Sequence, residues 1–295
     1  MKKINIINIG VILVCFLSLV SCGKSNYNKS TEITNSNQNA EQNMKNTEDE
    51  QNANTEKVIY DIKGSSKNLT EKEKSAQKKW MEDIIKVAKQ YPNDAFVNGD
   101  INKKNVALTF DDGPDGRITA KILDILKQNN VKGNFFFIGE NVSKFPGVVR
   151  RADKEGNLIL NHSYDHPDFK QKNNEEIKNQ ILKTENIIYK TIGKKPAIIR
   201  PPYGDVDERV VSSILQTGDK ITIWSIDTLD WSQKEKDNIV KNVLDNLRPG
   251  DIVLMHSNGD KAATAEALPI IIKGIKEKGY EIVTLDKMLN IKAYK

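Results

Sequence analysis

The chain has 295 residues, enough for one or two domains. Only 38% of them are hydrophobic, which is low for a wholly globular chain and indicates that part of it does not join a core. The net charge of +5, without a basic cluster interleaved with aromatic residues, argues against a nucleic-acid-binding protein and tolerates anionic surroundings.

The N-terminus has the layout of a targeting segment. Lys2 and Lys3 precede the apolar run 6–20, which is typical of a secretory signal and a little short for a membrane span of about 20 residues. The run ends in LVSC (19–22), which resembles the lipobox of a bacterial lipoprotein. This resemblance implies that residues 1–22 are a lipoprotein-type signal and that Cys22 carries the lipid anchor at the outer face of the cell membrane. An uncleaved N-terminal anchor is the alternative.

Two segments separate this signal from the main domain. Residues 23–57 are almost all Asn, Lys, Ser, Thr, Gln and Glu, so we expect a disordered tether that cannot bury enough apolar surface to fold. Residues 58–102 are expected to form an N-terminal helical extension, because Thr70 and Glu73 have the spacing of a capping box and Pro92 ends the pattern.

The extension carries an apolar stripe at helical spacing. Its members are Trp80, Ile84, Val87, Ala88 and Tyr91. We expect this stripe to pack on the main domain; binding of a partner protein is the alternative.

Residues 103–295 alternate short apolar runs with helical patterns. The predicted strands are 106–110, 133–139, 157–161, 197–200, 220–226, 251–255 and 281–285. The predicted helices are 118–129, 146–155, 174–191, 207–217, 236–247 and 263–278. This alternation predicts an α/β fold with a parallel sheet, and about seven units suit a distorted, incomplete (β/α) barrel. A doubly wound open sheet is the alternative.

Reactive side chains gather where the predicted strands end. Five strand ends carry them: Asp111 with Asp112, NHSYDHPD (161–168), RPPYG (200–204), DTLDW (227–231) and His256. In both candidate folds the active site forms at the carboxyl ends of the strands. We therefore expect these side chains to meet in one site.

The histidines indicate which kind of site this is. The chain has only three: His162, His166 and His256. The first two are four residues apart, so one helical turn would place both rings on one side. Two imidazoles and one carboxylate leave an open position on a four-coordinate Zn²⁺, which is the pattern of a catalytic site. Asp111 or Asp112 can supply the carboxylate.

The motifs TFDDGP, H-S-x-x-H, R-P-P-Y-G, D-x-x-D-W and L-M-H, in this order, resemble those of the polysaccharide deacetylases of carbohydrate esterase family 4, the NodB-homology domain. The resemblance covers about residues 103–290, within a domain that we expect to span 103–295. It implies a distorted barrel and removal of N-acetyl groups from polymers of N-acetyl sugars. It also implies one divalent metal ion, usually Zn²⁺, with Co²⁺, Ni²⁺ or Mn²⁺ as alternatives.

The resemblance implies that Asp112, His162 and His166 hold the metal and that Asp111 is the general base. Arg200 would orient Asp111. The chemistry agrees, because a carboxylate can take the proton of an attacking water. A guanidinium that is always charged can hold such a carboxylate by a forked contact.

The resemblance further implies that Asp230 partners His256, the general acid. An amide nitrogen must be protonated before it leaves, and an imidazole beside a carboxylate suits that step. The backbone N–H of Tyr203 would help to bind the oxyanion. Trp231 and Leu254 would wall the acetyl pocket.

Other function classes fit parts of the pattern. A solute-binding surface lipoprotein would share the anchor and tether but would not need two His and two Asp at strand ends. A metal-dependent phosphatase or nuclease favours further carboxylates for a second metal, and Asp115 is the nearest candidate. A glycosidase uses carboxylates several Å apart, which adjacent residues are poorly placed to provide.

The anchor and tether favour peptidoglycan as the N-acetylated glycan polymer, with chitin-like or other surface glycans as alternatives. The sequence does not decide whether N-acetylglucosamine or N-acetylmuramic acid loses its acetyl group. We expect a monomer that hydrolyses the amide, releases acetate and binds no nucleic acid.

Overall fold

The computed structural model describes residues 57–295, which belong to one compact unit. The predicted signal segment, Cys22 and the tether up to residue 56 lie outside the described residues. Among the helices of the described part, none combines the length and the apolar character needed to cross a membrane.

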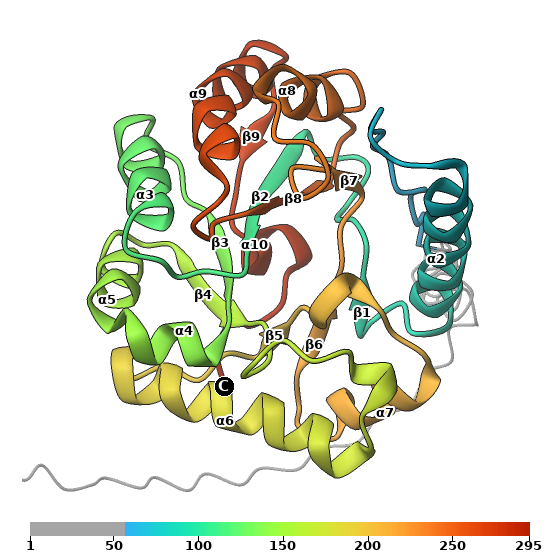
Figure 1. Ribbon diagram of the computed structural model, residues 1–295, viewed down its shortest axis with the longest axis vertical. Helices are drawn as coiled ribbons and strands as arrows, with labels where there is room; N and C mark the ends of the chain where they lie inside the picture. Colours follow the sequence, from blue (N-terminus) through green and yellow to red (C-terminus); the bar gives the residue numbers. More distant parts are fainter. Residues whose placement is uncertain (1–56) are drawn as a thin grey trace, which may run out of the picture. The chain divides into compact units, whose positions relative to one another are not determined.

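A single parallel sheet forms the centre of the unit (Figure 1). Its strands are β1 (Ala95–Phe96), β2 (Asn105–Asp111), β3 (Asn134–Phe137), β4 (Leu158–Asn161), β5 (Ile198–Ile199), β6 (Lys220–Thr222), β7 (Ile226–Asp227), β8 (Asp251–His256) and β9 (Glu281–Ile282). The order is β1-β6-β5-β4-β3-β2-β8-β7, with β9 beside the start of β2. Around the curled sheet the strands follow in the order β2, β3, β4, β5 and β6. Beyond β1 and the opening come β7 and β8, and β8 pairs with β2, so β2 to β8 keep the chain order of a barrel. The sheet is open between β7 and β1, so the incomplete (β/α) barrel is confirmed.

The helices lie around the sheet in Figure 1, except α10, which lies near the centre of the ring of strands. They are α2 (Glu71–Gln90), α3 (Ile118–Gln128), α4 (Gly139–Lys144), α5 (Pro146–Lys154), α6 (Asn174–Ile192), α7 (Glu208–Leu215), α8 (Lys236–Leu244), α9 (Ala262–Glu277) and α10 (Leu285–Leu289). Two short 3₁₀ turns, η1 (Phe169–Gln171) and η2 (Pro202–Gly204), follow β4 and β5. All six predicted helices of the barrel are present, with ends shifted by a few residues.

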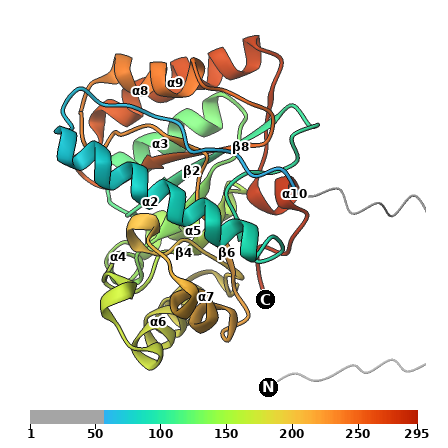
Figure 2. The same ribbon diagram turned by 90° about the vertical axis from the view of Figure 1, so that its right-hand side faces the viewer.

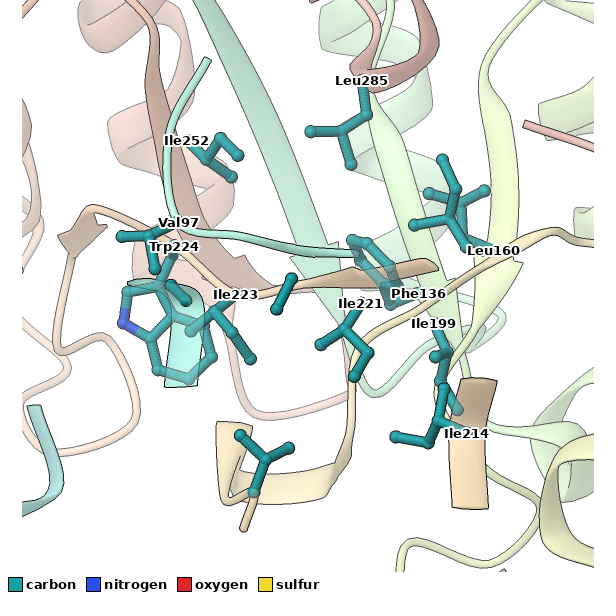
Figure 3. Packing of buried hydrophobic residues seen from close by; sticks show 14 of the residues in the cluster. Val97, Phe136, Leu160, Ile199, Ile214, Ile221, Ile223, Trp224, Ile252 and Leu285 are labelled. Atoms are coloured by element: carbon teal, nitrogen blue, oxygen red, sulfur yellow. The ribbon is translucent and has the colours of Figure 1, made fainter. Parts of the chain in front are cut away.

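Alternate side chains of the strands enter two different cores. In β2, Ala107 joins the cluster inside the barrel, whereas Val106, Leu108 and Phe110 join the cluster under the outer helices. Figure 3 shows the inner cluster, with Phe136 of β3 among its members. This alternation follows from the two-residue period of a strand, and it determines which residues can face the interior.

The predicted strand 220–226 is wrong as one element. It forms two strands on different sides of the opening: β6, which pairs with the edge strand β1, and β7, which is the edge strand at the other end of the order. The three residues between them cross the open side of the barrel, and the hydroxyl of Ser225 donates to the Asp251 carboxylate there. Apolar character alone cannot locate such a crossing, because Ile223 and Trp224 remain buried within it.

Two further differences concern short elements. The predicted strand 281–285 ends at Ile282, and Leu285 begins α10, where its N–H donates to Asn134. Strand β1 was not predicted, because two residues carry no measurable period.

The extension helix α2 confirms both sequence signals. Thr70 and Glu73 form a capping box, and the helix ends two residues before Pro92. Ile84, Val87 and Ala88 are buried against the inner cluster, so the apolar stripe packs on the barrel. Figures 1 and 2 show α2 lying across the side on which the sheet is open.

Candidate active site

Strand geometry brings the predicted catalytic side chains to one end of the barrel. Asp111 lies an even number of residues after Ala107 in β2, and His256 lies an even number after Ile252 in β8. Both therefore share the face of these inner-cluster residues and point toward the barrel interior. The two residues are also register partners in neighbouring strands. His162 follows β4 with the parity of Leu160. The predicted meeting of strand ends is therefore confirmed.

Asp112, His162 and His166 offer one ligand atom each, and these atoms lie within 4.8 Å of one another. Among residues 57–295 this is the only such group. The Oδ1 atom of Asp112 lies 3.5 Å from Nε2 of His162 and 3.4 Å from Nε2 of His166. Ligands about 2.1 Å from a tetrahedral ion stand roughly 3.4 Å apart, so the spacing fits a metal such as zinc.

The protonation states of this group also fit a metal. Burial would raise the pKa of Asp112, but contact with His162 and the nearby imidazoles hold it well below its usual range. Burial, with His162 adding to it, lowers the pKa of His166 to about 4. An ionised carboxylate and a neutral imidazole are the forms that bind a cation. Oδ1 of Asp112 is buried without a hydrogen-bond partner, which leaves it free for an ion.

The chain fixes the direction of the His162 ring. Its Nδ1 lies 2.7 Å from the carbonyl oxygen of Arg200. Because a carbonyl only accepts, Nδ1 carries the proton and Nε2 presents its lone pair to the site. The loop to His166 is held by side-chain hydrogen bonds, with Ser163 receiving the His166 N–H and Gln180 receiving the Tyr164 N–H.

Asp111 lies beside the ligands but is held by another group. Nη1 of Arg200 donates to Oδ1 of Asp111 at 2.7 Å and to Oγ1 of Thr109 at 2.9 Å. The remaining oxygen of Asp111 lies 3.8 Å from Nε2 of His162, farther than the Asp112 oxygen. The predicted forked contact between Arg200 and Asp111 is wrong, because Nε and Nη2 donate instead to the carbonyls of Thr222 and Ile223.

The Arg200–Asp111 pair is buried and its loss should be costly. Arg200 is fully buried, and its side chain and that of Asp111 are 0% and 4% exposed. Arg200→Ala should lower the free energy of unfolding by about 3–5 kcal/mol, because the carboxylate would stay buried without its cation. Urea unfolding with a chelator present measures this change without a contribution from bound metal. Lys79→Ala, which removes an exposed pair on α2, is the control and should leave the midpoint unchanged.

Asp230 and His256 form a second buried pair. Oδ1 of Asp230 lies 2.6 Å from Nδ1 of His256, and Oδ2 accepts from the His256 backbone N–H and from Thr264. Burial alone would lower the pKa of His256, but the charge and hydrogen bond of Asp230 outweigh it and raise that pKa to about 9. His256 is therefore an imidazolium at neutral pH, and its partner Asp230 stays ionised.

Three further predicted residues line this end of the barrel. Tyr203 is exposed, and its ring meets the His166 ring edge-on at 4.7 Å. Leu254 is buried in β8, whereas Trp231 is 46% exposed. The Trp231 indole N–H points at the carboxylate of Asp227, 3.3 Å from Oδ1.

Sequence reasoning named the segment that begins with Asp227 but gave this residue no role, and it missed Thr264. Asp227 is buried and also accepts the Leu229 N–H, and burial raises its pKa to about 6. Its place at the start of DTLDW, at a strand end, was a usable signal. Thr264 stands inside a helix pattern 34 residues from Asp230, and nothing in the sequence singles it out.

The backbone is strained around these side chains. Seven described residues other than glycine have positive φ, and five of them lie in the loops of this site. The five are Asp112, Ser163, His166, Tyr203 and Leu229. Such conformations cost about 1–3 kcal/mol each and gather where function requires a fixed geometry.

Comparison with known proteins agrees with this geometry. The family model of polysaccharide deacetylases matches residues 98–221. A peptidoglycan-N-acetylglucosamine deacetylase of Bacillus cereus is 47% identical over 193 residues, covering 65% of this chain and 70% of the relative. A peptidoglycan-N-acetylmuramic acid deacetylase of Bacillus subtilis is 35% identical over 65% of this chain, but only 40% of that relative is covered.

A solved structure of a related protein is also similar in fold. The crystal structure of a peptidoglycan N-acetylglucosamine deacetylase in complex with a benzamide compound is 44% identical. It superposes with a TM-score of 0.66 and covers 68% of this chain and 94% of the other.

Proposed function

Because the chain belongs to the polysaccharide deacetylase family, we propose that it removes N-acetyl groups from peptidoglycan, with N-acetylglucosamine as the sugar that is deacetylated. The observation that carries the proposal is the joint presence of three parts at one end of the barrel. These are the three-ligand group of Asp112, His162 and His166, the Arg200–Asp111 pair, and the Asp230–His256 pair. The choice of sugar is supported by the 47% identity to the N-acetylglucosamine enzyme of Bacillus cereus.

We infer that Asp112, His162 and His166 hold one divalent ion, Zn²⁺ or, in its place, Co²⁺, Ni²⁺ or Mn²⁺. When bound, such an ion polarises the acetyl carbonyl and makes a water more acidic at neutral pH. The group fits this task because it supplies three ligands and leaves a position open.

Asp111 acts as the general base in the proposed reaction. Its carboxylate takes a proton from the attacking water, while Arg200 fixes its orientation from the other side. The backbone N–H of Tyr203 donates to the oxygen that becomes negatively charged. Trp231 and Leu254 border the space for the acetyl methyl group.

His256 acts as the general acid. Its imidazolium, stabilised by Asp230, gives a proton to the sugar nitrogen as the bond to the acetyl carbon breaks. Acetate and a free amine on the glycan are the products. A solute-binding role does not account for two charge pairs beside a three-ligand group.

A phosphatase or nuclease is supported less well. Among the described residues no second carboxylate-rich group stands beside the three ligands, and Asp115 instead accepts the Thr119 N–H at the start of α3. A glycosidase would need two carboxyl groups flanking a bond, whereas Asp111 is tied to Arg200.

The proposal is tested on purified peptidoglycan. The chain should release acetate, and mass spectrometry of the digested product should place the new amine on glucosamine. An amine on muramic acid would overturn the choice of sugar. Acetate from chitin oligomers but not from peptidoglycan would overturn the choice of polymer.

We also propose that Cys22, outside the described residues, anchors the chain as a monomer to the outer face of the bacterial membrane. The motive is the LVSC sequence after an apolar run. Cys22→Ala should abolish incorporation of labelled fatty acid into the chain. Unchanged labelling in that variant would rule the anchor out.

A further inference from the structure

Trp80 of α2 is connected to the site indirectly, through contact with the indole ring of a second tryptophan. Its ring stacks on that of Trp224, with centroids 5.2 Å apart and planes 27° from parallel. Trp224 lies in the crossing between β6 and β7 and is 5% exposed. Trp80 belongs to the extension, outside the residues 98–221 that match the family model.

Trp224 in turn packs on Arg200. The centre of the Arg200 guanidinium lies 5.4 Å from the Trp224 ring and 4.2 Å from the Phe136 ring. Figure 3 shows Trp224 and Phe136 in the inner cluster. Nη2 of Arg200 also donates to the carbonyl of Ile223, directly before Trp224. A shift of Trp224 would therefore displace the Arg200 guanidinium, which holds Asp111 in place.

Both indoles also press on the RPPYG segment. Gly204 has φ +62°, and a Cβ there would meet ring atoms of Trp224 at 2.6 Å and of Trp80 at 2.9 Å. The residue before it is Tyr203, the proposed oxyanion donor, which also has positive φ. The two rings thus lie against the backbone at Gly204, the residue directly after Tyr203.

The ring faces, rather than hydrogen bonds, make these contacts. The indole N–H groups of Trp80 and Trp224 are both buried without a partner. Stacked aromatic pairs contribute about 0.5–1.5 kcal/mol beyond the area they bury. The face of a guanidinium likewise packs favourably on an indole.

We propose that Trp80 is a positioning residue for the hydrolytic reaction. Its ring holds Trp224 against Arg200 and Gly204, and so keeps Asp111 and the Tyr203 N–H in place. The inference rests on the proposed function, and it assigns to the extension helix a part in the geometry of the reaction.

The test compares Trp80→Ala with Trp80→Phe and with Ile84→Ala. Ile84 lies one turn further along α2, is 1% exposed, and is the matched control for loss of packing. Trp80→Ala should lower kcat by about 10–100-fold with little change in KM or metal content, because small misplacements of reacting groups are costly. Trp80→Phe should recover most of the loss. Ile84→Ala should lower the midpoint of unfolding while keeping kcat.

A second measurement does not need turnover. Hydrogen exchange of residues 200–205, followed by mass spectrometry, should become faster in Trp80→Ala and stay unchanged in Ile84→Ala. Unchanged exchange and kcat in a folded Trp80→Ala would overturn the inference, as would an equal loss of kcat in Ile84→Ala. A wild-type chain that releases no acetate would overturn the proposed function, while the exchange experiment would still decide whether Trp80 supports the segment.

Discussion

Asp111→Asn should lower kcat by about 10²–10⁴-fold and leave the metal bound, whereas the neighbouring Asp112→Asn should lose the metal. The two carboxylates are adjacent in sequence but differ in their partners. Asp111 is tied to Arg200 at 2.7 Å, while Oδ1 of Asp112 has no hydrogen-bond partner and faces two imidazoles. An Asn at residue 111 keeps the shape but cannot take a proton.

Metal analysis and kinetics on the same samples separate the two roles. In the wild-type chain, chelation should abolish acetate release and added Zn²⁺ should restore it. Asp112→Asn should need much more Zn²⁺ for half-maximal activity, because a neutral amide is a weaker ligand than a carboxylate. If Asp111→Asn instead loses the ion and regains turnover at high Zn²⁺, the two aspartates have been assigned the wrong way round.

The sequence was sufficient to predict the location of those site residues whose side-chain direction depends only on the two-residue period of a strand. Asp111 and His256 follow from counting along β2 and β8, because side chains alternate between the two faces. His162 follows in the same way from β4. These are local rules, so they do not require knowledge of the remainder of the fold.

Several other contacts between distant segments were not predicted from the sequence. Arg200 was expected to fork onto Asp111, but its donors are shared with carbonyls of a crossing that the pattern showed as one strand. Thr264 reaches Asp230 from a helix, and Trp80 reaches Trp224 from the extension. The contacts of Arg200 and Trp80 depend on how the barrel opens between β7 and β1, which the spacing of apolar residues along the chain does not predict.

An equally large loss of kcat is expected when the Asp230–His256 pair is disrupted. This loss can be distinguished from a loss of bound metal. His256→Ala should lower kcat by about 10²–10⁴-fold, the usual range for a general acid, with metal content unchanged. The reason is that Nδ1 of His256 is engaged by Asp230, and His256 is not among the three residues whose ligand atoms cluster.

The pH dependence gives a sharper form of the same prediction. A general acid must be protonated, so activity should fall as pH rises through the pKa of His256, which Asp230 raises to about 9 against the effect of burial. Asp230→Asn removes that negative charge, and the alkaline limb of the pH–rate profile should move to lower pH. Because the two residues act as a unit, the double variant should be little worse than His256→Ala alone. Loss of the ion from His256→Ala would make this residue a ligand and contradict its role as the acid.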